Sequence, residues 1–134
     1  MLDIILIQHA DTGINLLEYR QESTTMKREH SDIFSGFMTA IQNITTELDI
    51  GYVVLISTEG KRGHNCIIIP RYPINVIALV DQADPIDIWK NEGNKIADKF
   101  IETFGLSFDP YEVEKFQSFI PIIRDLCSLH EYCD

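Results

Sequence analysis

Three residues of the types that zinc accepts as ligands recur near the end of the chain, in the stretch "CSLHEYC". Cys127, His130 and Cys133 follow one another at intervals of three. On a helix this spacing places Cys127 beside His130 but carries Cys133 well round the axis. A fourth ligand would have to come from His9, His64 or Cys66. Nothing in the sequence brings one of them near, so we expect no metal and interpret the stretch as a helix end with one buried thiol and a frayed tail.

The stretch "EGKRG" contains a glycine–lysine pair, which phosphate-binding loops also contain. The GxxxxGK[ST] spacing is absent, and the segment joins two predicted strands rather than a strand and a helix. We therefore interpret it as the exposed tip of a hairpin. Lys61 and Arg62 form one of the few basic spots on this acidic chain, which makes them candidates for contact with a protein partner.

The remaining polar residues form no arrangement that predicts an enzyme. His9 closes a predicted strand next to Asp11, which is typical of a histidine satisfied at a strand end rather than of an acid–base catalyst. Ser57 has no nucleophile elbow around it, and the many carboxylates form no distinguishable catalytic pair. Trp89, near a predicted helix start, is interpreted as a core residue, with an interface anchor as the alternative. We expect no catalytic residue and no cofactor.

The chain of 134 residues carries a formal net charge of −10. This excess of acids argues against nucleic acid as a partner, because neutralising phosphates requires Lys and Arg. It also argues against direct adsorption to an anionic membrane. Residues 81–134 hold twelve acids against five Lys or Arg. That imbalance predicts a solvated acidic helical surface or, as the alternative, a surface that faces a basic partner.

Length and hydropathy predict one domain, 1–134, with a core of its own. No stretch approaches the roughly 18 apolar residues of a membrane span, and the first residues lack the regions of a secretory signal. We therefore expect a cytoplasmic protein without direct membrane insertion. Three cysteines are an odd number and do not suggest a disulfide framework, and Cys66 is interpreted as a buried strand thiol.

Five strands are predicted from short apolar runs and the turns between them. Residues 2–9 are apolar on both alternating sets, which is typical of a strand covered on both faces. The stretch "ADTG" predicts a hairpin turn into a more mixed edge strand over residues 14–20. Three further strands are expected at Tyr52–Ser57, Asn65–Ile69 and Asn75–Asp81.

The clearest helix is predicted over Asp32–Asp49, with Ser31 or Asp32 as its N-cap. Its apolar stripe recurs at spacings of three and four and consists of Ile33, Phe37, Ile41, Ile44 and Leu48, widened by Phe34 and Met38. We expect this stripe to be buried against the sheet and Gly36 to allow close packing there. Gly51 suits the helix stop.

The last third of the chain is predicted to be helical. Asp84, Pro85 and Asp87 suit the cap and the first turn of one helix, which Gly93 could bend. The apolar side of this helix consists of Ile86, Trp89, Ile96, Ala97, Phe100 and Phe104. The stretch "FDPYEVEKF" has the same pattern of capping residues and predicts the start of a second helix. The apolar series that follows consists of Val113, Phe116, Ile120, Ile123 and Cys127.

The predicted order of elements is β-β-α-β-β-β-α-α, an α+β fold with one helix on one face of a five-stranded antiparallel sheet and two on the other. This order resembles the longin domain, the SNARE-like module of trafficking complexes, whose sheet order is 2-1-5-4-3 and whose wider group includes roadblock and profilin folds. The stretch "SDIFSGFMTAIQNITTEL" is similar to the first helix of archaeal longin-like proteins. The stretches "ILIQHADTGINLLEY" and "KIADKFIETF" resemble their first hairpin and second helix. Roadblock proteins usually begin with a helix, so longin is the better match.

The resemblance implies a non-catalytic platform that binds other proteins. Several longin-like proteins sit beside Ras-like small GTPases as scaffolds or exchange-factor subunits. We accordingly expect a protein partner, such as a small GTPase, another longin or roadblock subunit, or a second copy of the chain. No SNARE coiled coil follows the third predicted helix, which favours a stand-alone subunit. The alternative is a small-ligand sensor that uses a cavity between sheet and helices, as profilin-like relatives can.

One edge of the predicted sheet is the apolar strand "YVVLIS", Tyr52–Ser57. It contains no proline and no charge, and strand edges of this kind are normally protected or used for pairing. We therefore expect Val54 and Leu55, or the adjoining face of the Asp32–Asp49 helix, to contact a protein partner.

Overall fold

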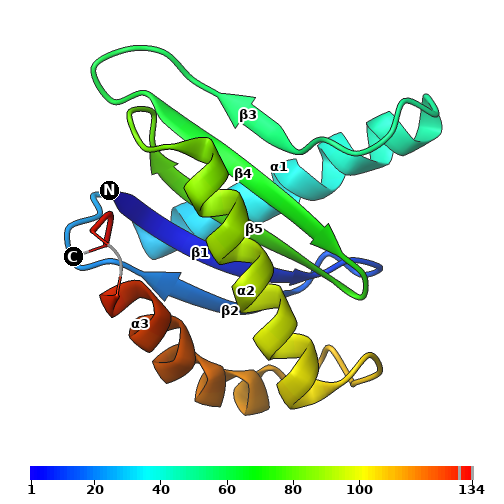
Figure 1. Ribbon diagram of the computed structural model, residues 1–134. Coiled ribbons are helices and arrows are strands. Elements are labelled where there is room, and N and C mark those ends of the chain that lie inside the picture. Colours follow the sequence, from blue (N-terminus) through cyan, green and yellow to red (C-terminus); the bar gives the residue numbers. More distant parts are fainter. Residues whose placement is uncertain (130, 134) are drawn as a thin grey trace.

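The computed structural model describes residues 1–129 and 131–133 and shows a five-stranded antiparallel sheet in the order β2-β1-β5-β4-β3 (Figure 1). This confirms the predicted strand order. The strands are β1 (Leu2–His9), β2 (Asn15–Arg20), β3 (Leu55–Ser57), β4 (His64–Arg71) and β5 (Ile74–Asp81). The helices are α1 (Arg28–Glu47), α2 (Ile86–Phe104), the 3-10 helix η1 (Val113–Phe119) and α3 (Ile120–Ser128).

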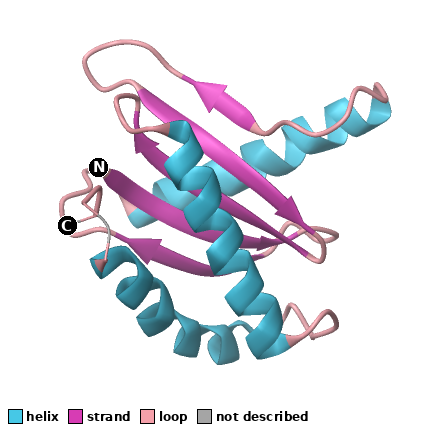
Figure 2. Ribbon diagram, in the orientation of Figure 1, coloured by secondary structure: helices cyan, strands magenta, loops and turns pink. Residues whose placement is uncertain are grey.

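The helices cover both faces of the sheet. Helix α1 crosses one face, and α2 and α3 lie on the other (Figure 2). Strands β1 and β5 therefore bury both of their alternating sets of side chains, as the unbroken apolar run over residues 2–9 predicts. None of the helices among the described residues is long and apolar enough to cross a bilayer.

The core is much thicker on the α2 side of the sheet than on the α1 side. Phe100, which is fully buried, contacts the rings of Phe116 and Phe119 at centroid distances of 5.6 and 5.3 Å. Gly93 belongs to the same packing, since a Cβ there would lie 2.4 Å from Ile69 Cδ1, so its role is close approach to β4. The buried residues on the α1 side are Ile4, Leu6, Met38, Cys66, Ile68 and Ile77.

The sequence predicted Asp84 as the N-cap of α2, but Asp84 does not occupy that position. The helix begins at Ile86 with Pro85 in the cap position. The Asp84 carboxylate instead accepts bonds from the Met1 ammonium at 2.6 Å and from Trp89 Nε1 at 2.9 Å. Trp89 is 2% exposed, so its assignment to the core is confirmed and its role as an interface anchor is excluded. The cap prediction failed because the Met1 ammonium and the Trp89 indole occupy the carboxylate.

The interpretation of the stretch "CSLHEYC" as a helix end with one buried thiol and a frayed tail is wrong, and the three cysteines, whose odd number did not suggest a disulfide framework, include one disulfide. Cys127 and Cys133 are bonded to each other, because the tail after α3 turns back and brings their Cα atoms to 5.6 Å. Cys66 is the free cysteine, and burial raises the pKa of its thiol to about 12. His130 lies outside the described residues. Both sulfurs of the candidate zinc group are engaged with each other, and the described residues contain no cluster of metal-ligating side chains.

Candidate protein-binding surface

Helix α1 exposes the apolar stripe that the sequence placed in the core. Ile33 is 72% exposed, Phe37 51%, Ile44 57% and Leu48 62%. Phe34 and Met38 make the contact with the sheet instead. Gly36 is also exposed, with no atom within 4 Å of an added Cβ, so it does not serve close packing as predicted. The predicted orientation of α1 is therefore wrong.

The buried side of α1 is a row of small polar side chains one turn apart. Ser35 lies opposite Gln8 of β1, whose Nε2 donates to Ser35 Oγ at 2.9 Å and to Thr39 Oγ1 at 3.1 Å. Ser35 Oγ in turn donates to Asn15 Oδ1 on β2 at 2.7 Å. Gln8 is only 2% exposed, and a buried amide without partners would cost about 1–3 kcal/mol. These bonds hold the polar side of α1 against the sheet.

The first turn of α1 is fastened to β2 in the same way. Ser31 is not the N-cap that the sequence predicted but a buried residue within the helix. Its Oγ donates to Glu18 Oε1 at 2.6 Å and accepts from Arg20 Nη2 at 3.0 Å. Arg20 also pairs with Glu18 at 2.6 Å, which neutralises both charges. Gln8 on β1 and the polar residues of β2 are met by hydroxyls of α1, and the stripe with Ile33 and Phe37 is left facing solvent.

The segment after α1 extends the exposed apolar surface toward β3. Gln42 holds this segment in place, because its Nε2 donates to Val53 O at 2.8 Å and its Oε1 accepts from Val53 N at 3.0 Å. Ile50 is 69% exposed and Tyr52 67%. With the stripe on α1, these side chains form what we call the α1–β3 surface: Ile33, Phe37, Ile44, Leu48, Ile50, Tyr52, Val54 and Leu55.

Strand β3 is the short edge of the sheet beside this surface. It covers Leu55–Ser57 rather than the predicted Tyr52–Ser57, because the Gln42 side chain occupies the backbone groups of Val53. Val54 O accepts from Ile68 N, so by the alternation of antiparallel strands the backbone groups of Leu55 point away from β4. Val54 is 44% exposed and Leu55 39%. Both candidate contact residues thus lie at an open edge.

The candidate basic residues lie in the loop between β3 and β4 and are both exposed. Arg62 lines a surface cleft together with Met26 and His30, so the structure brings it to the beginning of α1. Lys61 precedes it at the hairpin tip, as predicted. Arg62 therefore lies near the beginning of α1 rather than among the residues of the α1–β3 surface.

His9 and Ser57 have local partners. His9 Nδ1 lies 2.8 Å from Thr12 Oγ1, as expected for a satisfied histidine at a strand end. Ser57 Oγ donates to Asn65 Oδ1 at 2.7 Å on the neighbouring strand. Neither side chain is arranged with a second catalytic group.

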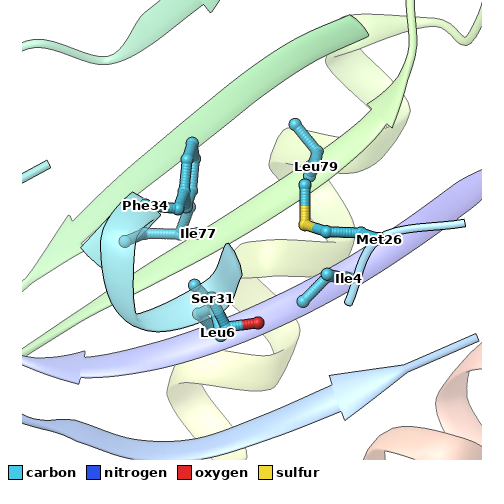
Figure 3. Close-up of a pocket in the computed structure, with 7 residues that line it drawn as sticks. All are labelled: Ile4, Leu6, Met26, Ser31, Phe34, Ile77 and Leu79. Carbon is cyan, nitrogen blue, oxygen red and sulfur yellow. The ribbon is translucent and has the colours of Figure 1, made fainter. Parts of the chain in front are cut away.

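A small apolar cavity lies between α1 and the sheet (Figure 3). Its lining consists of Ile4, Leu6, Met26, Ser31, Phe34, Ile77 and Leu79. Its volume is about 10 Å³, which is hardly the size of one water molecule. A ligand sensor requires a cavity of several hundred Å³, so this cavity does not support the alternative function.

No protein-family model and no curated protein sequence matches the chain. Solved structures do match it. MglB from Myxococcus xanthus superimposes with a TM-score of 0.54 and 10% identity over 77% of this chain and 83% of that chain. The roadblock/LC7 domain from Streptomyces avermitilis superimposes with a TM-score of 0.56 and 8% identity over 79% and 87%.

The fold is of the roadblock and longin type. At these identities the likeness establishes the architecture alone. Both neighbours belong to the wider group that the predicted longin resemblance includes. In this chain η1 and α3 follow α2.

Proposed function

We propose that this chain is a non-catalytic interaction subunit that pairs with a second copy through the α1–β3 surface. As a pair, it would scaffold or regulate a Ras-like small GTPase or a trafficking-like complex in the cytoplasm. The function rests on protein contacts, and no residue of the chain is assigned a catalytic role.

The observation that carries the proposal is the exposed apolar stripe on α1. The helix is already held on the sheet by Ser31, Ser35 and Thr39, so the stripe is not needed to attach it. Fully burying one Ile, Leu or Phe side chain is worth about 1.5–3 kcal/mol. Large exposed apolar patches on folded proteins mark interaction sites, and we propose that the stripe is part of one.

The open edge of β3 supports a second copy as the occupant. Two antiparallel edges can pair across a two-fold axis, and each would then satisfy the outward backbone groups of Leu55 in the other. The α1 stripes would approach one another beside that pairing. A stable contact of this kind buries about 1,200–2,000 Å² in total. The proposal of a small GTPase as the partner is supported by the resemblance to longin-like proteins, several of which act beside small GTPases.

Sedimentation equilibrium of the wild type, Phe37→Asp and Asn43→Asp tests the pairing. We expect the wild type to be a dimer at micromolar concentration and Phe37→Asp to be a monomer with native circular dichroism and a cooperative melt. Asn43 is exposed on a flank of α1 away from the stripe, so the control adds the same charge without affecting association. A wild type that remains monomeric up to high micromolar concentration would exclude the homodimer.

A pull-down from the native source tests the partner. Wild type, Phe37→Asp and Asn43→Asp would serve as matched baits, with GDP or a non-hydrolysable GTP analogue added, and the bound proteins would be identified by mass spectrometry. We expect a small GTPase on the wild-type and Asn43→Asp baits and its loss on Phe37→Asp. Recovery that contains no GTPase, or a GTPase bound equally to all three baits, would contradict the proposal.

A further inference from the structure

The C-terminal tail is closed into a short loop by a disulfide. Cys127 lies near the end of α3, and Cys133 lies six positions later, with the two Cα atoms 5.6 Å apart. Cys127 is 6% exposed and Cys133 9% exposed. Both cysteines are therefore largely buried while the tail is closed.

The closed tail rests on the ends of two strands. Tyr132 O accepts a hydrogen bond from Leu2 N of β1 at 2.8 Å. Gln21, directly after β2, donates from its Nε2 to Cys127 Sγ at 3.2 Å. Figure 1 shows the tail beside the beginning of β1. Tyr132 and Cys133 also pack against the main core. The disulfide therefore holds the tail at the end of the sheet where β1 starts and β2 ends.

The third cysteine takes no part in this arrangement. Cys66 lies on β4 and belongs to the core on the α1 side of the sheet, whereas Cys127 and Cys133 belong to the core on the α2 side. Burial raises the pKa of the Cys66 thiol to about 12, which keeps it protonated and poorly nucleophilic at neutral pH. Thiol chemistry in the folded chain is thus confined to Cys127 and Cys133.

We propose that Cys127 and Cys133 are a reversible thiol–disulfide pair that latches the C-terminal tail onto the β1–β2 end of the sheet. The oxidant is a small-molecule disulfide such as oxidised glutathione. One cysteine thiolate attacks it, which releases one small thiol and leaves a mixed disulfide on the protein. The other cysteine thiolate then attacks the mixed disulfide and releases the second small thiol. The protein loses two electrons and two protons, and these are taken up by the two small thiols that are released.

The geometry makes this latch sensitive to reduction. Once the disulfide is reduced, noncovalent contacts hold the end of the chain, among them the bond from Leu2 N to Tyr132 O and the packing of Tyr132 and Cys133, and a chain end held in this way opens more easily. Opening of the tail also frees Leu2 N and exposes the thiols to the next oxidant. Reduction consequently changes the order of the tail without disturbing α1, β3 or the aromatic packing of α2.

Intact-mass analysis of the full chain tests the chemistry. The wild type would be incubated with oxidised or reduced glutathione, denatured, and alkylated with N-ethylmaleimide. We expect one adduct, on Cys66, after oxidised glutathione and three adducts after reduced glutathione. Three adducts after both treatments would show that no disulfide forms. One adduct after both would show a disulfide that glutathione does not reduce. Either result would overturn the proposal.

Hydrogen exchange and thermal unfolding test the latch. Reduction is expected to speed exchange of the Leu2 amide at least tenfold and to lower the melting temperature by about 5–8 °C, because a short loop is no longer closed. Cys133→Ser should match the reduced wild type under both conditions, whereas Cys66→Ala should retain the redox response. A Leu2 amide that exchanges equally in both redox states would overturn the latch, whatever the variants show.

Discussion

Ser35 and Phe37 lie two positions apart on α1 and face opposite ways. Ser35 Oγ is buried and bonded to Gln8 and Asn15, whereas Phe37 is 51% exposed. An amphipathic helix usually packs its apolar side on the sheet, whereas α1 packs a mixed side there, in which Ser31 and Ser35 are buried together with Met38. The relationship explains why the sheet holds α1 firmly while α1 still offers an apolar surface to another protein.

The polar attachment of α1 predicts a large effect for a small change at Ser35. Ser35→Ala removes the hydroxyl that accepts from Gln8 and donates to Asn15, and both partners lie in a poorly hydrated site. We expect the free energy of unfolding to fall by about 1–3 kcal/mol in chemical denaturation. The exposed Thr46→Ala on the same helix should change it by less than about 0.5 kcal/mol. Equal effects of the two substitutions would show that the buried bonds do not hold the helix.

The two glycines within helices should respond differently to alanine. Gly36→Ala adds a methyl group that contacts nothing within 4 Å, so helix propensity should raise the stability by about 0.5–1 kcal/mol. Gly93→Ala gains the same propensity but places Cβ 2.4 Å from Ile69 Cδ1, and overpacking costs about 1–3 kcal/mol. Denaturant midpoints should therefore rank Gly36→Ala above Gly93→Ala. Equal gains at both sites would show that α2 can move away from β4 without cost.

The buried thiol of Cys66 predicts a loss of stability at alkaline pH. Burial raises its pKa from 9.0 to about 12, so the stability this thiol contributes is fully present below pH 9. Between pH 9 and 12 the unfolded chain ionises first, and the free energy of unfolding falls by up to about 1.4 kcal/mol per pH unit. Chemical denaturation of the wild type and Cys66→Ala at several pH values measures this. The stability difference between them should shift in favour of the variant above pH 9, and a constant difference would contradict the prediction.

The sequence of elements and the two-sided cover of the sheet could be predicted because their evidence is local, whereas the strand order 2-1-5-4-3 was implied by the resemblance to longin domains. Residues 2–9 and the run at Asn75–Asp81 are apolar on both alternating sets, which requires cover on two faces, and helices are available before and after the last strands. The helix at Asp84 was placed within two residues for the same reason. Its cap was missed because the Met1 ammonium, 83 positions away in sequence, and the Trp89 indole N–H donate to the carboxylate.

The orientation of α1 could not be predicted from its apolar stripe. Periodicity shows that one side of a helix is apolar, but burial in the core and burial under a partner leave the same pattern. A signal was present on the opposite side, where Ser31, Ser35 and Thr39 recur every four residues. To use this signal, one must also know which polar strand residues face these hydroxyls. That pairing is known only from the folded structure.

The open edge of β3 supplies the last prediction, at Val54. In the proposed pair this side chain lies beside the two-fold axis, so Val54→Asp would place a charge in an interface that excludes water. We expect sedimentation equilibrium to show association at least tenfold weaker, with native circular dichroism, because Val54 is 44% exposed in the isolated chain. Tyr111→Asp is the matched control, since Tyr111 is 73% exposed and lies after α2, far from β3 in the chain. If Val54→Asp remained folded and associated as tightly as Tyr111→Asp, the β3 edge would not take part, and the contact would have to be made by α1 alone.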